Sequence, residues 1–339
     1  MTRPAKILLI GAYANGNIGD LHQASSLAHH LSAILPEAVV HATSNSVAAK
    51  PYDFPRPDHV LPPSILRDYD RLSEYDAVIV GGGGLLAAIH RPLNSPNWPL
   101  HVTPPIILLS MGASAEVAQR CQTLIRRAAV VTGRDEQSCA VLRRFRDDVE
   151  LIPDPILADE RLDAPARAPR DELARLGVIP RKPAPEHHEI FRRLAAEMKS
   201  RDRAITLFPA TDAASGALQH FQDGQVVAAR TIAECVQAID RVTGVVSARY
   251  HGCILAAKRR APSIGVVTGF EGPATKIHEF YRQIAHEHLL VDFNSAPTNR
   301  NAIVRRLREE VDFGVIESRL SGLAAEFRRR LAGILQSLG

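Results

Sequence analysis

The chain has 339 residues, of which 45% are hydrophobic and 23% are charged, and its formal net charge is +4. This is an ordinary composition for a soluble protein, and the length allows two domains of about 150 residues each. So small a net charge argues against nucleic acid as a partner and is compatible with an anionic small ligand or an anionic membrane surface. The four cysteines form no CxxC pair, which is typical of buried thiols in a reduced cytoplasmic protein.

The first 20 residues do not form a signal peptide, because their apolar run is short and leads directly into a Gly/Asn turn. No stretch approaches the roughly 20 apolar residues that are needed to span a bilayer. We therefore expect a cytoplasmic protein, with peripheral contact at the inner face of the cytoplasmic membrane as an alternative.

Short apolar runs alternate with amphipathic helical segments, which is the pattern of parallel βαβ units. The predicted strands are residues 6–12, 38–43, 76–82, 105–111, 128–133 and 149–154 in the first half, and 175–180, 204–210, 225–229, 244–248, 262–267 and 289–293 in the second. The predicted helices are residues 21–35, 114–127, 135–145, 187–200, 231–242, 251–260 and 275–285. The sequence therefore predicts an α/β protein with mostly parallel sheets.

A segment rich in proline, alanine and charge separates the two halves and is typical of a linker. We expect two Rossmann-like domains that face each other across a cleft, at residues 1–158 and 173–315, joined by a linker at 159–172. The last segment, residues 316–339, is an amphipathic helix with a basic face. It is predicted to pack on the domains, and interfacial membrane contact is the alternative.

Two glycine-rich stretches follow predicted strands in the first half. The stretch "GAYANGNIGD" ends at Asp20 and precedes a helix, where backbone amides attract anions, although Asp20 could equally serve as an N-cap. Its spacing is not GxGxxG, which disfavours a dinucleotide. Four consecutive glycines, Gly81–Gly84, follow the third strand and indicate close approach of the backbone to a ligand, or else a tight strand-to-helix junction.

Charged residues follow two further strands of the first half. Arg134 stands just past a strand in "VVTGRDEQS", where it could reach a ligand or pair with one of the acids that follow it. Asp154 stands before the linker, where a turn residue is the simplest interpretation.

The second half carries "SARYHG" at a strand end and "GFEGPATKIHEF" beyond the next strand. Arg249, His251 and Lys276 are thereby predicted to meet at one edge of the sheet, where open α/β sheets bind ligands. Arginine binds a carboxylate or phosphate bidentately, lysine neutralises as a point charge, and histidine transfers protons near neutral pH. These three residues therefore predict a site for a small polyanion.

Other histidines could suggest a metal. The pairs His187–His188 and His286/His288 have no regular ligand spacing, and a solvated face is the favoured interpretation. No metal site and no bound cofactor are predicted.

The ordered motifs "GNIGD", "GGGG", "GRDEQS", "DP", "SARYHG" and the glycine-rich segment that ends at Lys276 resemble the polysaccharide pyruvyl transferase family, over residues 6–293. The resemblance implies a two-domain GT-B-like fold. It also implies transfer of the pyruvyl group of phosphoenolpyruvate, as co-substrate, to two hydroxyls of a cell-surface sugar, which forms a cyclic ketal. The acceptor would be a glycan or a lipid-linked oligosaccharide.

The resemblance and the chemistry together assign roles by position. His251 is the expected general acid, and Asp20 the candidate base. The expected donor-binding residues are Arg134, Arg249, Lys276, Gly82 and Gly83. Asn17 and Asp154 are expected to bind the acceptor. The family often has an acidic residue where this chain has Leu21, which weakens an acidic role at that position.

Two other functions remain open from the sequence alone. A GT-B-type glycosyltransferase would bind a nucleotide sugar with the same basic residues, although the expected ribose-binding glutamate is represented only by Glu271. A non-catalytic relative would keep donor binding without turnover. The acceptor sugar and the oligomeric state do not follow from the sequence.

Overall fold

The computed structural model describes residues 3–11, 13, 18–43, 60–83, 91–164, 176–179, 204–209, 225–229, 231–267, 273–292, 305–307 and 311–337. The chain divides into two compact units, residues 1–159 with 322–339, and residues 160–321. The sequence analysis predicted four segments, with boundaries at residues 158, 172 and 315. These boundaries stay predictions. Among the described residues, no helix is both long enough and apolar enough to cross a membrane.

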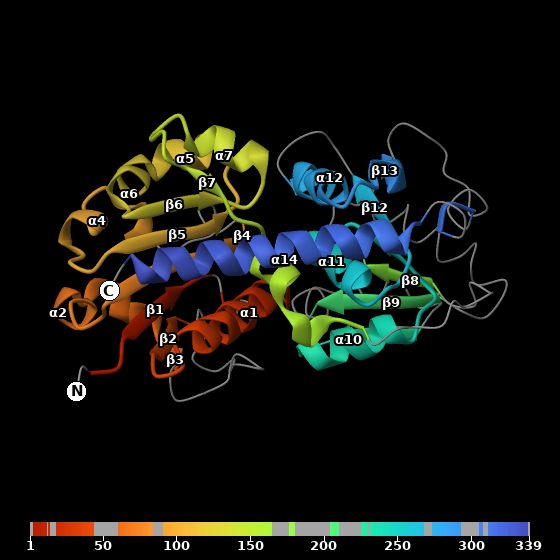
Figure 1. Cartoon of the computed structure of the whole chain (residues 1–339), viewed down its shortest axis with the longest axis horizontal. Helices are drawn as coiled ribbons and strands as arrows, with labels where there is room; N and C mark the ends of the chain where they lie inside the picture. The colour runs from red at the N-terminus through yellow and green to blue at the C-terminus, as the bar shows by residue number, and fades with distance from the viewer. Residues whose placement is uncertain are drawn as a thin grey trace. The chain divides into compact units, whose positions relative to one another are not determined.

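The first unit is built on a seven-stranded parallel sheet with the order β3-β2-β1-β4-β5-β6-β7 (Figure 1). Its strands are β1 (Lys6–Ile10), β2 (Val39–Thr43), β3 (Val60–Leu61), β4 (Ala77–Gly83), β5 (Ile106–Met111), β6 (Val130–Gly133) and β7 (Glu150–Leu151). Its helices are α1 (Ile18–Ile34), α2 (Tyr69–Leu72), α4 (Trp98–His101), α5 (Ala115–Arg120), α6 (Gln122–Arg127) and α7 (Glu136–Leu142). Short 3₁₀ helices are η2 (Pro63–Arg67), η3 (Arg91–Asn94) and η4 (Pro155–Ala158).

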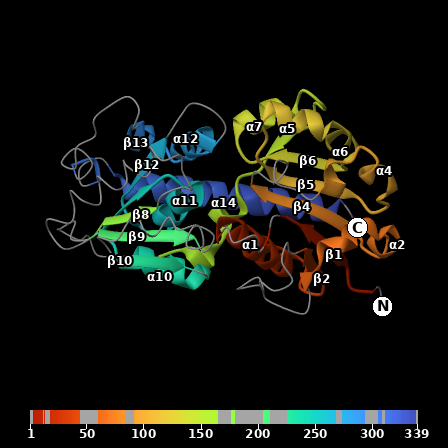
Figure 2. The ribbon, with the colours of Figure 1, turned by 180° about the vertical axis from the view of Figure 1, so that it is seen from behind.

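Both faces of this sheet are buried, because alternate residues of each strand point to opposite sides. In β1, Leu8 and Ile10 pack into a core with the helices α5, α6 and α7, whereas Ile7 and Leu9 pack into a second core with α1. Figure 2 shows α1 and α5–α7 on opposite sides of the strands. Continuous apolar runs such as 6–10 are therefore doubly covered parallel strands, as predicted.

The second unit repeats this layout with a six-stranded parallel sheet of order β10-β9-β8-β11-β12-β13. Its strands are β8 (Leu176–Ile179), β9 (Ala204–Pro209), β10 (Gln225–Ala229), β11 (Gly244–Ser247), β12 (Ser263–Val267) and β13 (Leu290–Asp292). Its helices are η5 (Glu160–Leu162), α10 (Ile232–Asp240), α11 (Tyr250–Lys258), α12 (Pro273–Gln283) and η7 (Glu287–Leu289). The expected helix at 187–200 lies outside the described residues.

The strand order reverses once in each sheet, between β1 and β4 and between β8 and β11. In open parallel sheets, ligands bind at the carboxyl ends of the strands on either side of such a reversal. The three glycines that end β4, Gly81–Gly83, and the segment "SARYHG", which begins at the last residue of β11, both stand at these points. The fold therefore marks one candidate position in each unit.

The last helix, α14 (Phe313–Gln336), starts in the second unit and ends in the first. Asp312 precedes it, and the Asp312 carboxylate accepts the backbone N–H of Val315 at 3.1 Å. Phe327 and Leu331 are fully buried in the core that contains α1. The part of α14 from Gly322 onward is therefore a structural part of the first unit.

Candidate functional site

Hydrogen bonds of the Ser247 side chain hold the turn between β11 and α11. The Ser247 hydroxyl accepts the N–H of Arg249 at 3.1 Å and donates to the carbonyl of Arg249 at 2.8 Å. A Cβ at Gly252 would lie 2.5 Å from this hydroxyl, so only glycine allows the first turn of α11 to approach so closely. The sequence "SARYHG" thus folds into a tight strand-to-helix turn with Arg249 at the N-cap position.

His251 lies in the first turn of α11, beside Tyr250, and the two rings meet edge to face with centroids 5.1 Å apart. Tyr250 also meets the ring of Phe280 edge to face at 6.2 Å. Phe280 belongs to α12, and Lys276 lies one helical turn before it on the same face of α12. The contact of Tyr250 with Phe280 packs α12 against α11, and Lys276 lies in the first turn of α12.

The arrangement is chemically suited to an anion. The N-terminus of α11 presents backbone amides and the positive end of its helix dipole at the carboxyl edge of the sheet. Arg249, His251 and Lys276 are each half-buried, and the Nε2 atom of His251 is itself buried. Arg249 and His251 thus lie at the start of α11 and Lys276 in the first turn of α12, and their roles at a common site stay predictions.

In the first unit, Gly82 has a φ of +81°, a conformation that residues with a side chain rarely adopt. A Cβ at this position would lie 2.8 Å from the Cδ of Gln23, which reaches Gly82 from α1. The Gln23 amide nitrogen donates to the Asp154 carboxylate at 2.7 Å. Gly82, Gln23 and Asp154 therefore form one contact chain, and Gly83 continues the strand in register with Met111 of β5.

Asp154 is completely buried and serves as N-cap of η4, where it accepts the N–H of Ile156 at 3.1 Å. The interpretation of Asp154 as a turn residue is therefore confirmed. The acceptor-binding role of Asp154 stays a prediction. Asn17, the other residue expected to contact the acceptor, lies outside the described residues.

Asp20 lies in the first turn of α1, which begins at Ile18, so the alternative role of Asp20 as N-cap is wrong. Tyr13 folds back over Gly11, and its hydroxyl donates to the carbonyl of Gly81 at 3.2 Å. Burial, and secondarily the charge of Asp20, raises the pKa of the Tyr13 phenol well above its usual value. Tyr13 therefore ties the glycine-rich turn after β1 to the end of β4.

Arg134 is 2% exposed, and its Nε lies 3.2 Å from the carboxylate of Asp135. Of the two alternatives that the sequence left open for Arg134, the structure shows the pairing with a following acid. Asp135 is also the N-cap of α7 and accepts the N–H of Ser138 at 2.7 Å.

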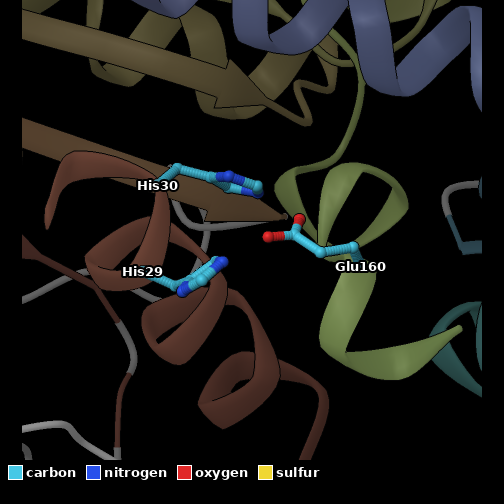
Figure 3. A group of neighbouring side chains, drawn as sticks. All are labelled: His29, His30 and Glu160. Atoms are coloured by element: carbon cyan, nitrogen blue, oxygen red, sulfur yellow. The ribbon is translucent and has the colours of Figure 1, made fainter. Parts of the chain in front are cut away.

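His30 on α1 and His286 before α14 are buried inside their units, and His29 is half-buried. His29 and His30 are consecutive on α1 (Figure 3), with ring centroids 5.5 Å apart. The ring of His30 also packs against Phe327 of α14, with centroids 4.9 Å apart. Glu160, also drawn in Figure 3, is the first residue of the second unit. His286 is buried, its Nδ1 lies 2.8 Å from the carbonyl of Ile284, and its Nε2 accepts the N–H of Asp312 at 3.1 Å.

The expectation of a solvated face is therefore wrong for His286, whose two ring nitrogens both form hydrogen bonds inside the second unit. His187 and His188 lie outside the described residues. The sequence analysis also missed Gln23 and Tyr13. No pattern in the sequence pointed to Gln23, because the burial of the polar side chains of α1 is seen only in the structure.

Three solved structures illustrate the likeness of the fold. HepE of Anabaena, solved with UDP and glucose, is 12% identical and has a TM-score of 0.65, over 98% of this chain and 100% of that one. MurG of Acinetobacter baumannii is 11% identical with a TM-score of 0.54, over 98% and 100% of the chains. The lipopolysaccharide outer core galactosyltransferase WaaB is 13% identical with a TM-score of 0.57, over 98% and 99%.

Such low identities establish the fold alone, and the fold is of the GT-B type, as predicted. No curated protein is significantly similar to the chain in sequence. The family model of the polysaccharide pyruvyl transferases matches residues 17–269, which is most of the chain and includes the glycines at the end of β4 and the turn "SARYHG". The chain therefore belongs to the polysaccharide pyruvyl transferase family.

Proposed function

We propose that this protein transfers the pyruvyl group of phosphoenolpyruvate to two hydroxyls of a sugar in a cell-surface polysaccharide or its lipid-linked precursor. The product is a cyclic pyruvate ketal, and inorganic phosphate is released. The observation that carries the proposal is the position of Arg249, His251 and Lys276 at the neighbouring starts of α11 and α12. Membership in the family supports the same reaction class.

The donor would bind at the carboxyl edge of the second sheet. Phosphoenolpyruvate carries a carboxylate and a phosphate a few ångströms apart. In the proposal, Arg249 binds one of these groups bidentately, and Lys276 neutralises the other as a point charge. The backbone amides of the α11 N-terminus add positive potential without an additional side chain.

The reaction begins with addition of an acceptor hydroxyl across the double bond of the enol. His251, as imidazolium, gives its proton to C3, and cationic character develops at C2, where the hydroxyl oxygen bonds. Asp20 is the candidate base for the proton of that hydroxyl. The second hydroxyl then displaces phosphate from C2 and gives its proton to the departing phosphate, so that two C–O bonds form to the sugar and one C–O bond to phosphate breaks.

The donor-binding roles of Arg134, Gly82 and Gly83, and the acceptor-binding roles of Asn17 and Asp154, stay predictions. A lipid-linked acceptor would place the reaction at the inner face of the cytoplasmic membrane, which also stays a prediction.

The first experiment measures the melting temperature of the protein with phosphoenolpyruvate, because a ligand that binds only the native state raises it. Arg249→Ala and Lys276→Met should weaken donor binding by roughly 10- to 100-fold, the range expected for a charge-assisted hydrogen bond. His251→Ala should leave donor binding nearly unchanged and lower the rate of phosphate release by about 10² to 10⁴. His278→Ala, an exposed histidine on the same helix as Lys276, is the control.

Equal loss of donor affinity in all three variants would make His251 a binding residue and remove its role as acid. A nucleotide-sugar glycosyltransferase is the second candidate, because HepE shares the fold and was solved with UDP and glucose. A melting shift with UDP-sugars or GDP-sugars, and none with phosphoenolpyruvate, would favour that candidate. Donor binding that is never followed by phosphate release, with any sugar, would favour a non-catalytic relative.

A further inference from the structure

The amino edge of the first sheet, where the chain enters each strand, carries exposed side chains of two kinds. The strand order β4-β5-β6-β7 places the segments that precede these strands next to one another along the edge. These segments are α2 before β4, α4 before β5, α6 before β6 and residues 143–149 before β7. Figure 1 and Figure 2 show α2, α4 and α6 together at this end of the first unit. It is the end opposite to the carboxyl edge, where the glycines of β4 lie.

The first kind of exposed side chain is apolar. Leu100 of α4 is 52% exposed and Tyr69 of α2 is 38% exposed, and among the described residues only Val315 is a further exposed large hydrophobic side chain. The two helices meet, because the rings of Tyr69 and His101 lie 5.1 Å apart. Exposed hydrophobic residues that are scattered singly are ordinary, whereas two on contacting helices indicate a surface with an apolar partner.

The second kind is basic and lies next along the edge. α4 packs against α6, and α6 ends at the exposed arginines Arg126 and Arg127. The guanidinium of Arg126 lies over the ring of Phe145, 6.0 Å from its centroid, so the segment after α7 lies against the end of α6. Arg144, which precedes Phe145, is also exposed. Three arginines from two segments therefore gather beside the apolar side chains.

These three arginines are not neutralised by the protein. Within the described part of the chain, no carboxylate forms an ion pair with Arg126, Arg127 or Arg144. Most acidic side chains of the edge are paired or stand beside an arginine: Asp148 pairs with Arg146, Glu74 with Lys6 and Asp76 with Arg3, and Asp68 and Asp70 alternate with Arg67 and Arg71. One further acid, Asp147, is exposed in the segment after α7. The edge therefore keeps an excess of positive charge around α6.

Basic and apolar side chains on one surface match the two layers of an anionic bilayer. Arginines near such a surface are attracted to the lipid phosphates, and leucine and tyrosine enter the zone between head groups and acyl chains. A free phosphate ion or a nucleic acid would bind the arginines and leave Leu100 in water. The terminal helix lacks this combination, because Arg329 pairs with Glu326 at 2.6 Å and Phe327 is fully buried.

We propose that this protein binds the anionic surface of a lipid bilayer through Tyr69, Leu100, Arg126, Arg127 and Arg144, which we call the amino-edge patch. A bilayer on the amino-edge patch leaves the carboxyl edge of the same sheet open to substrates, because the two edges are at opposite ends of the strands. The binding does not depend on the pyruvyl reaction, although a lipid-linked acceptor would meet the protein at the same membrane.

The test measures sedimentation of the full chain with vesicles of phosphatidylcholine alone and of phosphatidylcholine mixed with phosphatidylglycerol. We expect binding to the mixed vesicles at low salt, and much weaker binding to neutral vesicles or in high salt, which screens the attraction. Arg127→Gln/Arg144→Gln should weaken binding to the mixed vesicles by roughly 10- to 30-fold, which corresponds to about fivefold for each arginine. The melting temperature should stay the same, because both side chains are exposed.

Arg319→Gln/Arg329→Gln is the matched control, since it removes the same charge from two exposed arginines of α14. Its binding to the mixed vesicles should be nearly that of the wild type. If the control loses as much binding as the patch variant, the attraction belongs to the net charge or to the terminal helix, and the proposal falls. It also falls if mixed and neutral vesicles bind alike, or if the protein binds a DNA oligonucleotide and no vesicles.

Leu100 allows a spectroscopic test of the apolar contact. The single tryptophan of the protein, Trp98, is 1% exposed and donates from its indole nitrogen to the carbonyl of Leu66 at 2.8 Å, so its emission should not respond to vesicles. The Leu100→Trp variant should shift its emission to shorter wavelength when mixed vesicles are added. Emission that stays unchanged while the variant is bound to vesicles would show that Leu100 remains in water, and would overturn the proposal.

The same variants separate this inference from the proposed function. Vesicle binding that Arg127→Gln/Arg144→Gln weakens, in a protein that does not bind phosphoenolpyruvate, would keep the amino-edge patch and remove the pyruvyl reaction. Phosphate release with a soluble acceptor, together with vesicle binding that the variant leaves unchanged, would keep the reaction and remove the amino-edge patch.

Discussion

The Nε of Arg134 donates to the carboxylate of Asp135 over 3.2 Å, and both side chains are nearly withdrawn from solvent, with exposed fractions of 2% and 8%. The pair joins two elements, because Arg134 follows β6 and Asp135 caps α7. The backbone N–H of Arg134 also bonds the carbonyl of Met111 at the end of β5.

Arg134→Ala should lower the free energy of unfolding by about 3–5 kcal/mol, because the substitution leaves the buried Asp135 carboxylate without its counter-charge. Urea denaturation measures the loss. Arg120→Ala removes an exposed partner of Glu116, 3.9 Å away, and should cost at most about 0.5 kcal/mol. If Arg134→Ala instead leaves the free energy of unfolding unchanged and abolishes phosphoenolpyruvate binding, Arg134 is a donor-binding residue.

Glycine-to-alanine substitutions should raise the stability of the protein in α14 and lower it in α11. Gly322 and Gly333 are exposed in α14, and a Cβ at either position would meet nothing within 4 Å. Each substitution there should stabilise the protein by about 0.5–1 kcal/mol, because alanine loses less backbone freedom than glycine on folding. Gly252→Ala in α11 should destabilise, because the new Cβ would press on the Ser247 hydroxyl at 2.5 Å. The melting temperatures of the three variants show the direction of each effect. A higher melting temperature of Gly252→Ala would contradict the close packing of Gly252 against Ser247.

The cysteines should differ in reactivity. Burial raises the pKa of the Cys253 thiol to about 12 and that of the Cys139 thiol to about 11. Iodoacetamide at pH 8 should therefore modify the half-buried Cys235 first in the folded protein, and Cys253 and Cys139 only in urea, because the thiolate is the reactive form. Mass spectrometry of tryptic peptides identifies the modified residues. Rapid modification of Cys253 in the folded protein would show that α11 opens readily.

Glu326 should make a small pH-dependent contribution to stability. Hydrogen bonds from Arg329, and then from Arg330, hold the pKa of Glu326 below its usual range. A carboxyl with a lowered pKa in the folded state stabilises above its unfolded pKa and loses that contribution as the pH falls through its folded pKa. Glu326→Gln should therefore be less stable than the wild type at pH 7, by a few tenths of a kcal/mol, and equally stable near pH 3.

Denaturation at both pH values measures this difference. Glu37→Gln, an exposed carboxyl in the turn after α1, should show no difference at either pH. If the difference in stability between Glu326→Gln and the wild type is larger near pH 3 than at pH 7, the predicted direction of the pH dependence is wrong.

Much of the fold could be predicted because buried parallel strands appear as continuous apolar runs. The strands at 6–10 and 106–111 are examples, and both were found where predicted. β3 escaped prediction because only Val60 and Leu61 pair there, in a stretch interrupted by prolines. The expected helix at 114–127 is two helices, because Cys121 leaves the helical conformation (φ −97°, ψ 15°) between α5 and α6.

The candidate site likewise has residues that could be predicted from the sequence and contacts that could not. Arg249 and His251 could be found because a strand-to-helix turn is local in sequence, and the strand order explains why Lys276 joins them. The contact of Gln23 with Asp154 could not be found, because 131 residues separate them and no local pattern encodes a pairing across that distance. The burial of Arg134 could not be predicted either, because the local sequence pattern of an arginine after a strand is the same whether its side chain contacts a ligand or the core.

The course of α14 has a consequence for how the protein is made. Its buried residues Phe327, Leu331 and Leu335 complete a core whose other members include Leu9 and Leu27, near the opposite end of the chain. As the polypeptide emerges from the ribosome, the first unit cannot close that core until the last residues have left the exit tunnel. Translation that stops before residue 322 should therefore yield a first unit with an exposed apolar face, a substrate for chaperones rather than a working half of the enzyme.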